Sequence, residues 1–190
     1  MIDTRVRPHL QGFLGPIGGF LAGVGVTPAV MTAIGLAVTI AGAVVIALGY
    51  LATGALIALL GSALDGLDGT VARAAGSVTA RGAFLDAGSD RIGEIASFAA
   101  LAFAMEGNAR VLLLIVLSVG GAMLVPYLRA KAESVGLAGK NGFMGRAERV
   151  ILFALGLFTG LVEPMLWVMV VTVWLTAIQR FVSTYHRIDV

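Results

Sequence analysis

The chain of 190 residues has no cysteine, only two histidines and few charged residues. Without cysteine there is no disulfide framework, no thiolate metal site and no cysteine nucleophile. His9 and His186 lie in the terminal segments, and we expect both at the surface rather than as metal ligands. Charged residues make up 13% of the chain, whereas 58% is hydrophobic. A soluble domain of this length cannot bury so much apolar surface, so the surplus is expected to face lipid.

Six apolar stretches of roughly 17–25 residues are predicted to cross the membrane as helices. They are Val30–Leu51, Gly54–Ala75, Arg81–Met105, Arg110–Arg129, Arg149–Val162 and Pro164–Ser183. The fifth is short, and the second and third contain aspartates. The connections are brief, which leaves no room for a separate soluble domain. The sequence therefore predicts an all-α integral membrane protein, with one domain over residues 1–190 and a six-helix bundle at 30–183.

The positions of lysine and arginine favour the same layout. With a cytoplasmic N-terminus, twelve of the thirteen basic residues fall at inner ends and loops, and only Arg110 falls outside. This is a positive-inside asymmetry, whereas a five-span layout would put these charges on both faces. It predicts a multi-pass protein of the plasma membrane, with both termini and the aspartates on the cytoplasmic side.

The segment Met1–Gly25 is too charged at its start to be a span. Beyond Pro8, apolar residues recur at helical spacing, at Leu10, Phe13, Leu14, Ile17, Phe20 and Leu21. We expect an amphipathic helix lying on the cytoplasmic membrane surface over residues 1–25. The alternative is a loosely ordered, glycine-rich tail.

Four aspartates cluster within 26 residues at predicted helix ends: Asp65, Asp68, Asp86 and Asp90. The first two are spaced i,i+3 and the last two i,i+4, so each pair shares a helix face. A short link around Ala75–Ala80 lets the two pairs face each other. Four ionised carboxylates repel unless cations neutralise them, and oxygen ligands alone favour Mg²⁺ or Mn²⁺. The alternative is a set of structural ion pairs with Arg73, Arg81 and Arg91.

Glycines accompany these aspartates at Gly66, Gly69 and Gly82. Glycine inside a helix costs about 0.5–1 kcal/mol, so each should have a reason. One reason is close approach of a ligand to the backbone, which we favour at Gly69; the other is tight helix packing. Arg73 follows Gly69 by four residues on the same face and can reach a diphosphate.

The run Asp65-Gly66-Leu67-Asp68-Gly69-Thr70-Val71-Ala72-Arg73, followed by Gly82, Asp86 and Asp90, resembles the signature of the CDP-alcohol phosphotransferases. It matches the pattern D-x2-D-G-x2-A-R-x8-G-x3-D-x3-D at every fixed position. The resemblance extends to the six-span layout and to Thr27-Pro28, and so covers nearly the whole chain. It implies transfer of a phosphatidyl group from CDP-diacylglycerol to a small alcohol, with release of CMP.

The resemblance also implies residue roles. Asp65, Asp68 and Asp86 correspond to ligands of two metal ions, and Asp90 to a ligand that is also the general base. The positions that hold the CDP part of the lipid correspond to Thr27, Pro28, Gly69, Arg73 and Thr79. Related enzymes are homodimers in the bilayer, and no nucleic-acid partner is expected.

The acceptor is indicated by two later stretches, 127–137 and 142–149, which resemble the actinobacterial phosphatidylinositol phosphate synthases. These enzymes use an inositol phosphate, a small phosphorylated alcohol. The basic pocket for its phosphate is expected at Lys131, Arg149 and Arg180, with Arg146 and Arg129 as weaker candidates. Alternatively these residues are ordinary positive-inside flanks. Phosphatidylglycerol phosphate synthase is the rival activity within the family.

Two other classes of membrane protein also use intramembrane carboxylates. An ion-coupled transporter would place them near the midplane and show repeated halves, and neither is evident here. An intramembrane prenyltransferase also has aspartate-rich metal motifs, but the short loops and the single long signature are unlike it. Product analysis with CDP-diacylglycerol distinguishes all of these.

Overall fold

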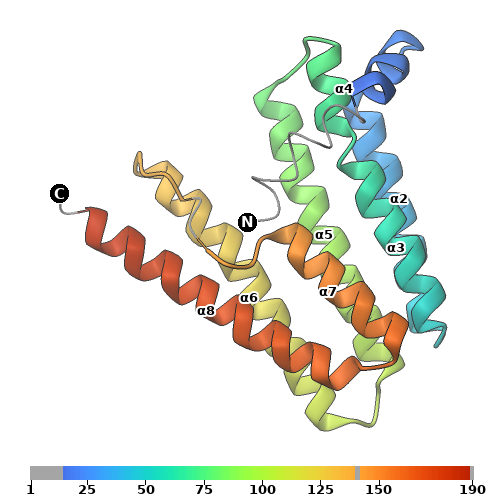
Figure 1. Cartoon of the computed structure of the whole chain (residues 1–190), viewed down its shortest axis with the longest axis vertical. Coiled ribbons are helices and arrows are strands. Elements are labelled where there is room, and N and C mark those ends of the chain that lie inside the picture. Colours follow the sequence, from blue (N-terminus) through green and yellow to red (C-terminus); the bar gives the residue numbers. More distant parts are fainter. Residues whose placement is uncertain (1–14, 140–141, 189–190) are drawn as a thin grey trace. The chain divides into compact units, whose positions relative to one another are not determined.

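The computed structural model describes residues 15–139 and 142–188, and the regular elements in this part of the chain are all helices (Figure 1). These residues form two compact units, one within Ile2–Ala104 and one within Met105–Val190. The predicted all-α class is confirmed. The single domain over residues 1–190 stays a prediction.

The first unit contains α2 (Pro28–Ala47), α3 (Leu51–Asp65), α4 (Asp68–Ala74) and α5 (Ala80–Ala104). Thr27 caps α2, because its Oγ1 accepts a hydrogen bond from the Val30 amide at 3.3 Å. Pro28 follows in the first turn, where a missing N–H costs nothing. The sequence Thr27-Pro28 thus fixes where α2 begins.

Glycines hold α2 and α3 together as an antiparallel pair. A Cβ added to Gly42 would collide with the backbone of Ala58, and one added to Gly61 would lie 2.5 Å from the amide nitrogen of Thr39. A Cβ on Gly35 would lie 2.7 Å from the backbone nitrogen of Asp65. Small residues let the helix backbones approach this closely.

Helix α5 packs on α2 and runs in the same direction. A Cβ added to Gly93 would lie 3.1 Å from Cγ2 of Thr39. Towards the start of both helices, Asp86 of α5 approaches Asp68, which accepts a hydrogen bond from Thr32 of α2. The N-terminal ends of α2 and α5 therefore lie at the end of the unit that holds the aspartates.

The second unit contains α6 (Ala109–Ser134), α7 (Arg146–Thr159) and α8 (Val162–Ile188). Helices α6 and α8 run in the same direction, because Arg110 pairs with Glu163 at 3.4 Å near their starts. Further along, the Trp174 indole donates to the carbonyl of Leu117 at 3.1 Å. Helix α7 packs on α8 where Gly156 faces Met165 and runs back in the opposite direction.

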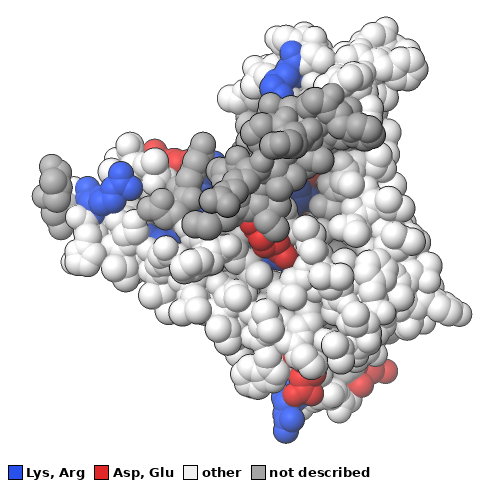
Figure 2. Space-filling model, viewed as in Figure 1, with Lys and Arg blue, Asp and Glu red and all other residues white. Residues whose placement is uncertain are grey.

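Within residues 15–139 and 142–188, four stretches are long and apolar enough to cross a membrane: Pro28–Ala47, Leu51–Ala74, Ala109–Ser134 and Val162–Ile188. Helix α5 has 25 residues but also five charged ones, and α7, with 14 residues, spans only about 21 Å. Large apolar side chains such as Phe103, Val116 and Trp167 are exposed, and the face in Figure 2 is mostly uncharged. These long apolar helices are consistent with a multi-pass membrane protein. The predicted number of six spans stays a prediction.

Part of the predicted interfacial helix is described. Residues 15–23 are helical, and a Cβ on Gly18 would lie 2.9 Å from the backbone of Thr70. This stretch therefore packs against α4. Residues 1–14 lie outside the described residues, and the membrane-surface position of this helix stays a prediction.

Candidate active site

The first two aspartates of the signature lie on either side of a helix break. Asp65 is the last residue of α3 and Asp68 the first of α4. Between them, Gly66 and Leu67 keep right-handed dihedral angles, but the Leu67 amide donates to Leu64 rather than to the carbonyl four residues back. The single helix predicted over Gly54–Ala75 is therefore two helices. The tightened turn still leaves both carboxylates on one side.

Three carboxylates converge at this break. Asp65, Asp68 and Asp86 each offer one oxygen atom, and these atoms lie within 4.8 Å of one another. Asp65 is only 3% exposed, and the other two are half-buried. A donor set of carboxylate oxygens suits a hard divalent cation such as Mg²⁺ or Mn²⁺. The structure thus brings these three residues together, and their role as metal ligands stays a prediction.

Helix α2 makes two contacts with these carboxylates that the sequence did not predict. The Thr32 hydroxyl donates to Oδ2 of Asp68 at 2.8 Å. Gly35, one turn further along α2, lies directly against Asp65. A threonine and a glycine in an apolar helix carry no distinctive signal, so only the packing of α2 reveals their place.

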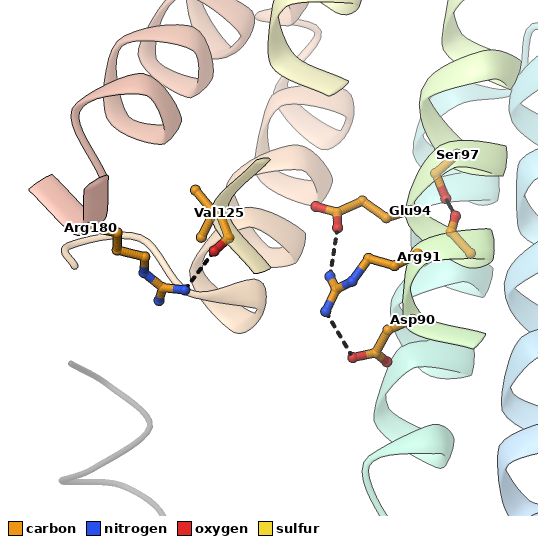
Figure 3. A network of polar contacts seen from close by, with 7 residues as sticks. Asp90, Arg91, Glu94, Ser97, Val125 and Arg180 are labelled. Atoms are coloured by element: carbon orange, nitrogen blue, oxygen red, sulfur yellow. Dashed lines mark hydrogen bonds and ion pairs between the residues drawn. The ribbon is translucent and has the colours of Figure 1, made fainter. Parts of the chain in front are cut away.

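Asp90 lies one turn of α5 beyond Asp86 and is not part of the three-carboxylate group among the described residues. Figure 3 shows Arg91 between Asp90 and Glu94. Its guanidinium lies 3.8 Å from Oδ2 of Asp90 and 3.3 Å from Oε2 of Glu94. The side chains of Asp90 and Glu94 are 11% and 7% exposed. Arg91 is thus a structural ion-pair partner of Asp90, and Glu94 is a buried acid that the sequence analysis did not single out.

The residues assigned to the CDP part of the lipid all belong to the first unit. Thr79 caps α5, since its Oγ1 accepts from the Gly82 amide at 3.1 Å, much as Thr27 caps α2. A Cβ on Gly69 would lie 3.4 Å from Nη1 of Arg73, so this guanidinium lies over the glycine as the spacing predicted. Both threonines thus have a capping role in the fold, and their contact with a lipid diphosphate stays a prediction.

The space around Gly66 and Gly82 bears on whether each glycine serves helix packing or the approach of a ligand. A Cβ at Gly66 or Gly82 would meet only neighbouring atoms of its own chain segment, at 3.3 Å or more. Contacts among the described residues therefore give no sign of tight helix packing at either glycine. Between α2 and α3, close helix packing instead involves Gly35, Gly42, Gly54 and Gly61.

Three of the predicted basic residues gather in the second unit. Nη1 of Arg180 donates to the carbonyl of Val125 at 2.8 Å (Figure 3), and Arg129 and Arg149 are close enough for their positive charges to act on Arg180. Arg149 is only 2% exposed. Concentrated positive charge at a buried arginine is a feature of sites for phosphorylated ligands. Lys131 is exposed near the end of α6, and Arg146 is half-buried at the start of α7.

A sequence profile of a known family matches most of the chain. The family is described as CDP-alcohol phosphatidyltransferase, and the match covers residues 25–179. The chain belongs to this family. The match includes every predicted metal and CDP-lipid position, and it ends one residue before Arg180.

Named relatives of this phosphatidyltransferase extend over nearly its whole length. The archaetidylinositol phosphate synthase of Pyrococcus horikoshii is 30% identical over 192 residues, 98% of this chain and 98% of the relative. The phosphatidylinositol phosphate synthase of Mycolicibacterium smegmatis is 32% identical over 182 residues, 91% of this chain and 81% of the relative.

Solved structures agree with the fold of this phosphatidyltransferase. The phosphatidylinositol phosphate synthase of Mycobacterium tuberculosis, crystallised with CDP-DAG bound, has a TM-score of 0.83 and 31% identity. That likeness covers 90% of this chain and 93% of the solved one. A second structure of the same enzyme is a complex with manganese and citrate. The chain is thus an enzyme of phospholipid synthesis whose acidic cluster suits a divalent metal.

Proposed function

We propose that this enzyme transfers a phosphatidyl group from CDP-diacylglycerol to a hydroxyl of inositol phosphate, giving phosphatidylinositol phosphate and CMP. The main support for this reaction is that Asp65, Asp68 and Asp86, all part of the family signature, bring their carboxylates together. The acceptor is supported by relatives whose names differ in the lipid, archaetidyl or phosphatidyl, but share inositol phosphate.

Two Mg²⁺ or Mn²⁺ ions are the proposed cofactors, held by Asp65, Asp68 and Asp86 with Asp90 as a further ligand. When bound, they neutralise the diphosphate and polarise its phosphorus–oxygen bonds. The carboxylate-only donor set supports this proposal, since it lacks the nitrogen and sulfur ligands that favour zinc.

Asp90 is the proposed general base. It takes the proton of the acceptor hydroxyl as that oxygen forms a bond to the lipid-side phosphorus. The bond from this phosphorus to the bridging oxygen breaks, and CMP leaves with that oxygen. The ion pair with Arg91, itself bonded to Glu94, supports a fixed orientation of the Asp90 carboxylate.

The donor lipid is proposed to bind at Thr27, Pro28, Gly69, Arg73 and Thr79. Thr27 and Thr79 begin two helices that run in the same direction, and helix N-terminal ends favour anionic groups. The guanidinium of Arg73 lies beside Gly69, which has no side chain to cover its backbone. A diphosphate can therefore approach both the guanidinium and the backbone of Gly69.

The acceptor phosphate is proposed to bind Arg149 and Arg180, with Lys131, Arg146 and Arg129 contributing charge. The proximity of Arg129 and of Arg149 to Arg180 supports this site. Gly142, with a φ of +140°, lies against Arg180, since a Cβ there would be 3.2 Å from its Nε. Only glycine readily adopts such a dihedral angle, so Gly142 allows the loop to pass beside this guanidinium.

Six membrane spans are proposed, with both termini and the aspartates on the cytoplasmic side of the plasma membrane. The shared direction of α6 and α8 supports a crossing by the intervening α7, because two parallel spans need a return between them. Helix α5 packs along α2, which is long enough to cross the membrane, and this packing supports a crossing by α5 as well. A homodimer and one functional domain complete the proposal.

An acceptor screen tests the function. The detergent-purified enzyme is mixed with radiolabelled CDP-diacylglycerol and one of inositol phosphate, glycerol phosphate, free inositol or serine, and CMP release is measured. Inositol phosphate should give the highest kcat/KM. A preference for glycerol phosphate would identify a phosphatidylglycerol phosphate synthase instead, and absence of CMP release with every acceptor would refute the proposed reaction.

A further inference from the structure

The hydroxyl of Thr32 is bonded differently from those of Thr39 and Ser97, which are also buried in helices of the first unit. The hydroxyls of Thr39 and Ser97 donate to carbonyls one turn back on their own helix, each at 2.9 Å. Thr32 lies 3.2 Å from the equivalent carbonyl of Pro28 but only 2.8 Å from Oδ2 of Asp68, on another helix. A hydroxyl has a single proton to donate, and a carboxylate is the stronger acceptor. The main bond of Thr32 therefore goes to Asp68.

The hydrogen bond from Thr32 is well placed to fix the orientation of the Asp68 carboxylate. Thr32 is 2% exposed, so water does not compete for its proton. Asp68 begins a seven-residue helix whose N-cap, Leu67, makes no side-chain cap. The contact with Thr32 links this carboxylate to α2, while its ligand atom lies within 4.8 Å of those of Asp65 and Asp86.

We propose that Thr32 is a positioning residue of the metal centre, which orients the Asp68 carboxylate toward the cation that Asp65, Asp68 and Asp86 hold. This inference rests on the proposed metal centre. Ligating carboxylates need hydrogen-bond partners that fix their orientation, and loss of such a partner typically weakens metal binding by about 10- to 100-fold.

Manganese binding to the purified full chain in detergent tests this role without any turnover. Mn²⁺ alone is titrated, and free ion is measured by electron paramagnetic resonance. Thr32→Val replaces the hydroxyl by a methyl group and should raise the Kd for Mn²⁺ about 10- to 100-fold. Thr32→Ser keeps the donor and should bind within a few-fold of the parent.

Thr39→Val is the matched control. Thr39 lies on the same helix, is similarly buried at 9% exposure, and donates only to the carbonyl of Gly35 in the described structure. Its Kd for Mn²⁺ should stay that of the parent. Parent-like Mn²⁺ binding by Thr32→Val would overturn the inference, as would equal weakening by Thr39→Val.

Two further variants keep the outcome decisive. If Thr32→Val is not recovered folded, Thr32→Ala is compared with Thr32→Ser, and equal Kd values overturn the inference. Asp68→Asn distinguishes a failure of the proposed metal centre from a failure of the proposed role of Thr32. If it binds Mn²⁺ like the parent, the metal centre itself is refuted. If it loses Mn²⁺ while Thr32→Val retains it, only the role of Thr32 is refuted.

Discussion

Replacing Gly35 by alanine should push a metal ligand out of place. The new Cβ would lie 2.7 Å from both the backbone nitrogen and the Cβ of Asp65. Ordinary carbon contacts are about 3.5–4.0 Å, so α3 must move away by roughly 1 Å. Overpacking of this kind costs about 1–3 kcal/mol of stability. A displacement near 1 Å in a catalytic constellation can lower turnover about 100-fold.

The assay combines three measurements on detergent-purified Gly35→Ala: thermal unfolding, the Kd for Mn²⁺, and kcat with CDP-diacylglycerol. Gly42→Ala overpacks the same helix pair, against Ala58, about 10 Å further along α2. It should lose similar stability and much less Mn²⁺ affinity. Gly120→Ala, which has open space around it, should match the parent in all three. Parent-like stability and Mn²⁺ binding of Gly35→Ala would refute the reasoning, and identical Mn²⁺ losses at Gly35 and Gly42 would refute its specificity.

Three other outcomes follow from the site and the topology. Asp86→Asn should abolish turnover and weaken Mn²⁺ binding while the protein stays folded in detergent; full activity would contradict its role as a ligand. Single cysteines at Ser134 and Glu163 should react with an impermeant label from opposite sides of intact membranes if six helices cross. Labelling from one side would instead fit a crossing by the four longest stretches alone. Arg149→Gln should raise the KM for inositol phosphate about 10- to 100-fold, because a charge-assisted contact is worth about 1.5–3 kcal/mol. The KM for CDP-diacylglycerol should change little, and equal increases in both would indicate a general structural defect.

The chemistry of the site was predictable because its residues are close in sequence. Asp65 and Asp68 are separated by one helical turn, and the short link before α5 brings Asp86 back to them. Such local spacing determines which side chains share a face, whatever the rest of the fold does. The same locality explains the contact between Arg73 and Gly69.

The supporting contacts were not predictable because they join distant segments. Thr32 and Asp68 are 36 residues apart, and their bond depends on how α2 lies against α3 and α4. The break at Gly66 and Leu67 was also missed, since Asp65 to Ala74 reads as one helical pattern. Glu94 was not predicted because it lies outside the signature, although an acidic side chain that is only 7% exposed is a functional candidate on its own.

The three proposed metal ligands come from three helices, and two of these aspartates contact α2. Asp65 is pressed against Gly35, Asp68 is bonded to Thr32, and Asp86 lies on α5, which packs on the same helix. Carboxylates this close repel one another without a cation. The packing of the helices must therefore hold them together. Glycine contacts between α2 and α3 supply that constraint, since they fix the two backbones at a distance that no larger residue allows. The acidic signature thus provides the three proposed ligands, while the apolar helix α2 before it determines how closely their carboxylates approach one another.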